Sequence, residues 1–167
     1  MLTGDLVRLR PLRAEDWEAL FAVAADPELW ALHPAHDRWR EDVFRAYFDE
    51  GLASGGALLI LDRASGAAIG SSRYDDHRPD RGRVEIGWTF LARSHWGGAV
   101  NREVKRLMIG HMLPQVPTIV FRVGETNLRS RRALEKIGAV PTGETEDALV
   151  AGRPVRHLVY AISRVPL

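Results

Sequence analysis

Small residues separate an apolar segment from an amphipathic one near the middle of the chain. Residues 84–91 are followed by a short polar stretch and then by Gly97, Gly98 and Ala99. Small side chains let a ligand lie on the backbone, and the unpaired N–H groups at a helix start favour phosphate. We predict a pyrophosphate site made of Gly97, Gly98, Ala99, Val100 and Asn101.

One carboxylate, Glu85, stands within the otherwise apolar segment 84–91, a few residues before that turn. Burial disfavours the charged form of a carboxylate and so makes it a stronger proton acceptor near neutral pH. We therefore predict that Glu85 is a general base. The structural alternative is an ion pair with Arg73 or Arg83 along or across the sheet.

The segments around the turn predict a strand, a helix and a second strand. Residues 84–91 are apolar on both faces, as in a strand buried from two sides. Residues 100–113 place valine, leucine and methionine on one helical face, and residues 118–123 form another apolar strand. Such a crossover places strands 84–91 and 118–123 parallel to each other.

The remaining elements predict a mixed sheet in an α/β (α+β) domain. Three strand patterns at short spacing, ending with 84–91, indicate an antiparallel meander. Asn127 is a good helix N-cap, and Gly138 suits the end of that helix. The predicted order is β-α-α-β-β-β-α-β-α-β-β, with seven strands, over a single domain of residues 1–167. Its other predicted elements are strands at 6–12, 57–62, 67–74, 139–142 and 155–162 and helices near 14–26 and 41–52.

Composition narrows the functional classes. The 167 residues are 46% hydrophobic and 27% charged and include no cysteine, which excludes disulfides and a cysteine nucleophile. A net charge of +1 argues against nucleic acid as the partner. No apolar run approaches the roughly 20 residues of a membrane helix, so we expect a cytoplasmic protein that does not bind membranes. The six histidines show no paired metal spacing, and we expect no metal.

Three segments in this order resemble the GCN5-related N-acetyltransferase (GNAT) superfamily. They are LVRLRPLRAEDWEAL, VEIGWTFLARSHWGGAVNREVKRLM and TNLRSRRALEKIGA. More narrowly, they resemble the branch that acts on ribosomal-protein N-termini (RimJ/RimL-like). The resemblance implies the GNAT fold, with acetyl-CoA as cosubstrate. It also implies acetyl transfer to a primary amine, of a protein N-terminus or a small molecule, by direct attack in a ternary complex.

The resemblance also implies roles for individual residues. The backbone of Thr89, Phe90 and Leu91 is expected to pair with the pantetheine arm, and an N–H of Phe90 or a neighbour to polarise the thioester. Asn127 and Ser130 match residues that contact CoA, and Ser130 is a candidate proton donor to the leaving thiolate. In histone-modifying members of the superfamily the base glutamate stands at the place of Glu85.

The chain departs from the family pattern at two positions. Ser94 stands where the phosphate loop usually begins with Gln or Arg, so we expect Arg93 to serve the phosphate instead. Leu134 stands where many members carry a tyrosine acid, and Tyr160 is a second candidate acid or a core residue. Lys105 is expected to reach the phosphates or to remain in solvent.

Two alternatives to an acetyltransferase remain open from the residues. One is a non-catalytic CoA-binding regulatory or interaction module. The other is a nucleotide-binding enzyme such as a Rossmann dehydrogenase, although no G-x-G-x-x-G follows the first strand. A monomer and a homodimer are both compatible with the sequence.

Overall fold

The computed structural model describes residues 1–165, and for residues 76–79 it describes the backbone alone. Eight strands form one sheet in the order β1-β2-β3-β4-β5-β6-β8-β7. The strands are β1 (Leu2–Thr3), β2 (Val7–Pro11), β3 (Ala57–Asp62), β4 (Ala68–Arg78), β5 (Arg83–Leu91), β6 (Thr118–Gly124), β7 (Val140–Val150) and β8 (Arg153–Ile162). The helices are α1 (Trp17–Ala24), α2 (Pro27–Trp30), α3 (Glu41–Ser54), α4 (Ala99–Met112) and α5 (Leu128–Lys136).

The predicted crossover is confirmed. Strands β5 and β6 are parallel and are joined through α4, while the other pairs in the described sheet are antiparallel. The α/β fold class is therefore as predicted. The Rossmann alternative is wrong, because a doubly wound sheet is mostly parallel.

The structure adds to the predicted elements where local patterns are weak. The two-residue strand β1, paired through Leu2 with Leu9, makes eight strands instead of seven. Strand β7 extends to Val150, well beyond the predicted 139–142, and is almost entirely exposed. Its polar residues show no apolar alternation, and hydrogen bonding to β8 holds them in a strand. Asp26 caps the short helix α2.

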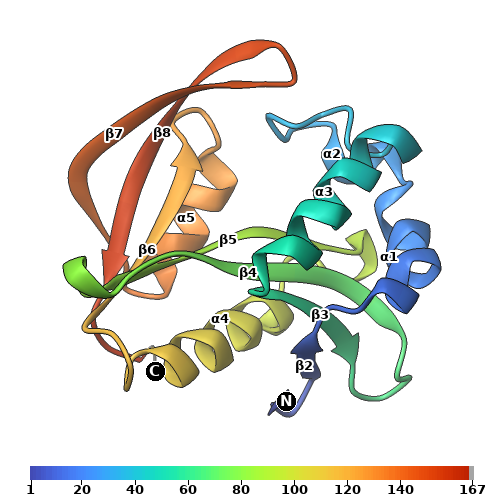
Figure 1. Cartoon of the computed structure of the whole chain (residues 1–167), viewed down its shortest axis with the longest axis horizontal. Helices are drawn as coiled ribbons and strands as arrows, with labels where there is room; N and C mark the ends of the chain where they lie inside the picture. Colours follow the sequence, from blue (N-terminus) through green and yellow to red (C-terminus); the bar gives the residue numbers. More distant parts are fainter. Residues whose placement is uncertain (166–167) are drawn as a thin grey trace.

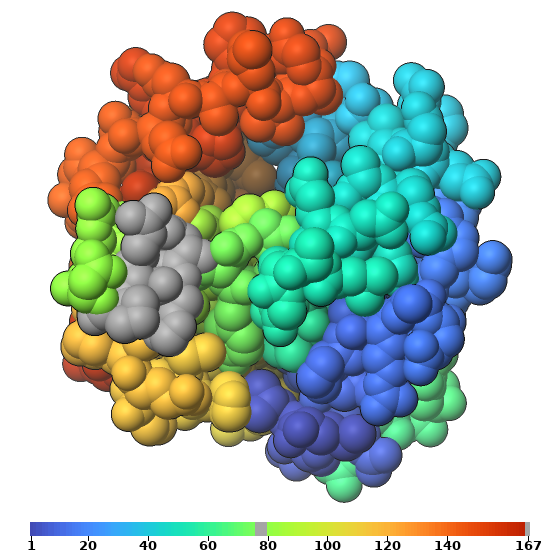
Figure 2. All heavy atoms as spheres, viewed as in Figure 1, coloured from blue at the N-terminus to red at the C-terminus, as the bar shows by residue number. Residues whose placement is uncertain are grey.

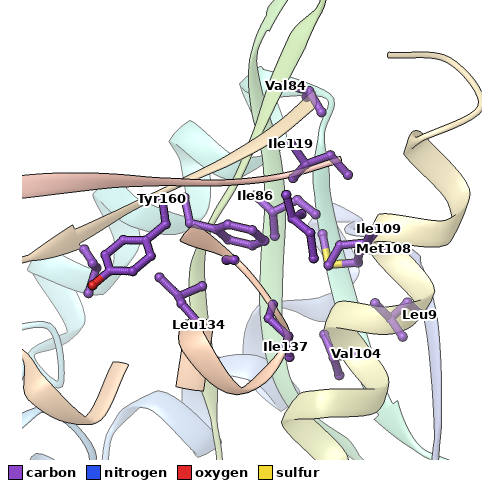
Figure 3. Close-up of a cluster of buried hydrophobic side chains, with 14 of the residues drawn as sticks. Leu9, Val84, Ile86, Val104, Met108, Ile109, Ile119, Leu134, Ile137 and Tyr160 are labelled. Carbon is purple, nitrogen blue, oxygen red and sulfur yellow. The ribbon is translucent and has the colours of Figure 1, made fainter. Parts of the chain in front are cut away.

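Two apolar clusters cover the two faces of the sheet. One joins α4 and α5 to the sheet, and Figure 3 shows part of it. The other joins the helices α1 to α3 to Leu59 and Phe90. Side chains alternate along a strand, so Val84 and Ile86 pack with α4 whereas Glu85 points to the opposite face.

Glu103 ties α4 to the first strands. Its carboxylate accepts hydrogen bonds from the backbone N–H groups of Asp5, Leu6 and Val7 at 2.8–2.9 Å. Burial raises the pKa of Glu103, but these bonds outweigh burial and leave the pKa below its ordinary value.

None of the helices in the described part of the chain combines the length and apolar composition that crossing a bilayer requires.

Candidate active site

Strands β5 and β6 pair over only a short distance and then separate. The parallel register covers Arg83–Thr118, Val84–Ile119 and Glu85–Val120. Beyond these residues, β5 crosses the molecule toward α1 whereas β6 turns toward α5 (Figure 1). The facing edges therefore keep unpaired backbone groups, which can accept an extended ligand as an added strand.

A bulge in β5 lies just beyond the last paired residue. Ser71 pairs with Phe90 and Arg73 with Gly87, so Trp88 and Thr89 together face Ser72 alone. Trp88 has φ 52°, in the left-handed region, which costs an L-residue about 1–2 kcal/mol. Its carbonyl accepts a 2.5 Å hydrogen bond from the Tyr47 hydroxyl of α3. The bulge turns β5 away from β6.

Backbone alternation decides which groups face this gap. The N–H of Ala92 donates to the Ile69 carbonyl of β4, so alternation directs the N–H of Phe90 to β4 as well. The backbone groups of Thr89 and Leu91 then lie on the edge toward β6. The ring of Phe90 is buried among the helices α1 to α3, so Thr89 and Leu91 are the better placed of the predicted residues.

The predicted pyrophosphate turn begins α4. Gly97 has φ 74°, which favours glycine, and Gly98 is the helix N-cap without any side-chain cap. A Cβ built on either glycine would meet no atom within 4 Å. The turn therefore leaves room directly over the first N–H groups of a 14-residue helix, which fits an anionic ligand.

The second predicted CoA segment meets this turn. The Arg129 guanidinium stacks on the Trp96 ring at 3.9 Å, and the Trp96 indole donates to the Leu91 carbonyl at 2.8 Å. The cap is confirmed, since the Asn127 side chain accepts from the N–H of Ser130 at 3.3 Å. Ser130 is half-buried on the first turn of α5. Two sequence segments thus converge beside the glycines.

Arg93 has a protein partner. Its Nε lies 2.5 Å from the Asp26 carboxylate at the start of α2. Hydrogen bonding to Arg93 holds the pKa of Asp26 below its ordinary value. A phosphate would have to compete with this ion pair, so the backbone of the turn is the stronger candidate for holding the anion.

Glu85 is buried, with an exposed fraction of 4%. It forms an ion pair with Arg122 of β6, not with Arg73 or Arg83 as the structural alternative expected. Arg122 also lies 2.9 Å from Glu146 of β7, while Arg73 pairs with Asp75 and Arg83 with Glu144. Arg122 therefore supplies the counter-charge of the Glu85 carboxylate.

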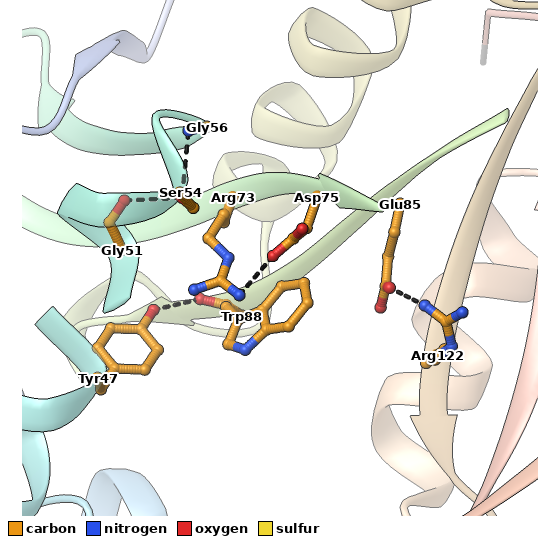
Figure 4. Close-up of polar contacts among 9 residues, drawn as sticks. All are labelled: Tyr47, Gly51, Ser54, Gly56, Arg73, Asp75, Glu85, Trp88 and Arg122. Carbon is orange, nitrogen blue, oxygen red and sulfur yellow. Dashed lines mark hydrogen bonds and ion pairs between the residues drawn. The ribbon is translucent and has the colours of Figure 1, made fainter. Parts of the chain in front are cut away.

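The face that carries Glu85 is hollowed. Figure 2 shows the hollow between α3 on one side and the β7–β8 hairpin on the other, with β5 at its base. Tyr47, Arg73, Trp88 and Glu85 point to the same side of the strands (Figure 4). The Arg73 guanidinium lies 3.8 Å from the centre of the Trp88 ring. A carboxylate and an aromatic wall thus face one open space.

Lys105 is a residue that the sequence analysis misplaced. It is buried, not solvated, and its Nζ donates to the Thr89 hydroxyl at 2.7 Å. Its position one residue after Val104 and three before Met108, on the apolar face of α4, was the signal for burial.

Of the other titratable residues, Tyr160, the second candidate acid, is a core residue, and His33 is uncharged. Tyr160 is fully buried in the core, and its hydroxyl contacts Arg131 and Glu135. Burial lowers the pKa of His33 to about 4, so the imidazole is neutral at pH 7. Within the described residues, no three His, Asp or Glu side chains gather as metal ligands.

A family model described as an acetyltransferase (GNAT) domain matches residues 7–140. The chain belongs to the GNAT acetyltransferase family. This GNAT chain is also 32% identical over 113 residues to the bifunctional protein GlmU of Symbiobacterium thermophilum. That match covers 64% of this chain and 24% of GlmU, so the chain spans about a quarter of the length of that curated relative.

Solved structures share the GNAT fold. A GCN5-related N-acetyltransferase from Brucella melitensis is 21% identical, with a TM-score of 0.85 over 97% of this chain and 77% of that one. A spermidine N-acetyltransferase from Vibrio cholerae, in complex with CoA and spermine, is 15% identical. Its TM-score is 0.73 over 95% of this chain and 96% of that one.

Proposed function

We propose that this chain transfers an acetyl group from acetyl-CoA to a primary amine by direct attack in a ternary complex. One observation carries the proposal. The open edge of β5 leads from the buried Glu85 to the Gly97–Gly98 turn, and beyond Glu85 it has no partner on β6. This edge is long enough to place the acyl end of a CoA thioester near Glu85 while its pyrophosphate lies at α4.

Different residues along this edge bind different parts of the acetyl-CoA donor. Backbone groups of Thr89 and Leu91 bind the pantetheine arm, and one of their N–H groups stabilises the developing oxyanion. The N–H groups from Gly97 to Asn101 hold the pyrophosphate, next to the cationic Arg129. Asn127 and Ser130 flank the same ligand. Bound acetyl-CoA supplies the activated acyl group.

Glu85 supplies the base. It accepts a proton from the attacking amine, directly or through a water molecule in the hollow, because the amine must be neutral to attack. Holding the two substrates together contributes as much as any single side chain. Ser130 is the proton donor to the thiolate that the family resemblance suggests.

The acceptor side carries charges of both signs. Arg73 pairs with Asp75, and Glu85 pairs with Arg122. Trp30 is buried and Tyr74 donates to the Met108 carbonyl of α4, so neither lines the hollow. This mixture suits an acceptor with its own mixed charges, such as an amino acid or a protein N-terminus, more than a purely cationic amine.

A non-catalytic CoA-binding module is the second candidate. Leu134 is buried in the core where many members of the family carry a tyrosine acid, and Glu85 is held by Arg122. Both observations fit a protein that binds CoA without turnover. Binding and catalysis must therefore be measured separately.

The test has two parts. Calorimetry compares acetyl-CoA with NADH and ATP, and thiol release is then followed over a panel of amino acids, peptide N-termini and polyamines. We expect acetyl-CoA to bind and an amine in the panel to release CoA. Failure of acetyl-CoA to bind contradicts both candidates, while binding without release on every amine favours the second.

Glu85→Gln tests the base. We expect kcat to fall by about a hundredfold, with the affinity for acetyl-CoA kept. The matched control is Glu18→Gln, because Glu18 is exposed on α1. Full activity of Glu85→Gln would remove Glu85 as the base.

A further inference from the structure

Lys105 lies at the start of the gap between β5 and β6. Its Nζ is 2.7 Å from the Thr89 hydroxyl of β5 and 5.7 Å from the centre of the Phe121 ring of β6. The last paired residues are Glu85 and Val120. Thr89 and Phe121 both lie beyond them. The ammonium therefore spans the two strand edges where they have just separated, on the face covered by α4.

The Lys105 ammonium has no anionic partner within the described residues. The acidic side chains of α4, β5 and α5 are engaged elsewhere. Glu103 of α4 binds backbone N–H groups, Glu85 of β5 pairs with Arg122, and Glu135 of α5 contacts Tyr160. On the side of β4 and β5, the polar groups next to the ammonium are hydroxyls. The Thr89 hydroxyl, which accepts from Lys105, shares a 2.7 Å hydrogen bond with the Ser72 hydroxyl.

A buried ammonium without a counter-charge is costly to the fold, which suggests a role with a ligand. Lys105 has three N–H donors, and a single hydrogen bond, to Thr89, is made within the described residues. The backbone of Thr89 is also the proposed place of the thioester end of the donor. We therefore expect the thioester sulfur of the donor to accept a second hydrogen bond from Lys105 Nζ.

We propose that Lys105 is the acid that protonates the departing CoA sulfur, a role that rests on the proposed acetyltransferase function. The assignment replaces Ser130 as proton donor and leaves Ser130 as a contact to the ligand.

The proton balance is closed. The amine nitrogen bonds to the acyl carbon, and cleavage of the carbon–sulfur bond leaves its electron pair on sulfur. Lys105 gives one proton from Nζ to that sulfur and becomes a neutral amine. The acetylated nitrogen loses one proton to Glu85 or water, and transfer of that proton through solvent to Nζ returns Lys105 to its charged form.

The environment of Lys105 suits this transfer. Desolvation by burial lowers its pKa to about 7, below the value of about 8.5 for an ordinary thiol. Transfer from the ammonium to a thiolate is therefore downhill. The neutral amine is also tolerated in the apolar surroundings that disfavour the charged form.

The chain offers a direct measurement, because Lys105 and Lys136 are its only lysines. Lys136 is exposed on α5, so Lys136→Arg leaves a single lysine signal for NMR with carbon-labelled lysine. We expect Lys105 to titrate near neutral pH. The titration of Lys105 in the complex with coenzyme A should differ from that in the complex with the analogue that lacks the sulfur atom.

Kinetics give a second readout. Lys105→Met should lower kcat by about a hundredfold while the acetyl-CoA dissociation constant changes by less than about threefold. Lys105→Arg keeps the charge and tests whether a cation alone is enough. It should not restore kcat, since guanidinium does not release its proton at these pH values.

The outcomes separate this proposal from the proposed function. If acetyl-CoA does not bind the wild-type chain, the acetyltransferase proposal itself fails. If acetyl-CoA binds and turns over, three results each overturn the role of Lys105 alone. These are a titration near the ordinary lysine value, equal effects of coenzyme A and its sulfur-free analogue, or full kcat in Lys105→Met.

Discussion

Glu85 of β5 and Arg122 of β6 form an ion pair across the two strands where their parallel pairing ends. Glu85 and Val120 are the last paired residues of the two strands, and Arg122 lies two residues beyond Val120 on β6. The pair thus joins the strands at the closed end of the gap and holds the proposed base in the hollow.

We predict that Arg122→Met lowers the free energy of unfolding by about 2 kcal/mol, because Glu85 loses its counter-charge. The Arg122 side chain is 22% exposed, so the cost stays below that of a fully buried pair. The double variant Glu85→Gln/Arg122→Met should recover most of the loss in urea denaturation. Additive losses in the double variant would contradict the coupling.

Lys105→Met should stabilise the fold while it lowers activity. The pKa of Lys105 is lowered from 10.5 to about 7, so above pH 7 the unfolded chain binds a proton that the folded chain has released. Stability of the wild type therefore rises with pH, by at most about 1.4 kcal/mol per unit. The variant lacks this rise.

Denaturation from about pH 6 to 9 checks this prediction. Below pH 7 both states are protonated and the gap between variant and wild type is constant, with the variant more stable. The range ends at pH 9 because burial raises the pKa of Tyr47 to about 12, an effect of opposite sign at higher pH. Parallel pH curves for the two proteins would argue against a neutral Lys105.

Gly98→Asp separates helix capping from anion binding. Gly98 has φ −136°, with nothing near its built Cβ, and aspartate is a favourable N-cap. We expect equal or higher stability, by up to about 1 kcal/mol. The affinity for acetyl-CoA should fall more than about tenfold, because the carboxylate repels the pyrophosphate.

Gly98→Asn is the matched control, because it caps the helix without adding a charge. Melting temperatures and calorimetric titrations of both variants give the two readouts. Equal affinities of the two variants for acetyl-CoA would place the phosphates away from this turn.

Substitutions of the bulge residue Trp88 should reverse the order of stability that alanine and glycine usually show within a strand. Glycine inside a strand is normally less stable than alanine by about 0.5–1 kcal/mol. At φ 52° alanine carries the left-handed strain and glycine does not. Urea denaturation should therefore find Trp88→Gly at least as stable as Trp88→Ala, and the normal order would contradict a strained bulge.

The sequence by itself determined the elements whose causes are local. The periodicity of residues 84–123 predicted the strand, helix and parallel strand, and all three were confirmed. The predicted cap at Asn127 and the helix end at Gly138, with φ 88°, were also confirmed. These features depend on residues within one or two turns of each other, so local chemistry is sufficient to predict them.

Only the tertiary structure decided the partners of the charged groups. Lys105 meets Thr89 across 16 positions, Glu85 meets Arg122 across 37, and Arg93 meets Asp26 across 67. The helical position of Lys105 indicates only that it is buried, and the packing of α4 against the separating strands decides that its partner is Thr89. Long-range packing selects among several possible partners, and one sequence does not specify which of them comes within a few ångströms.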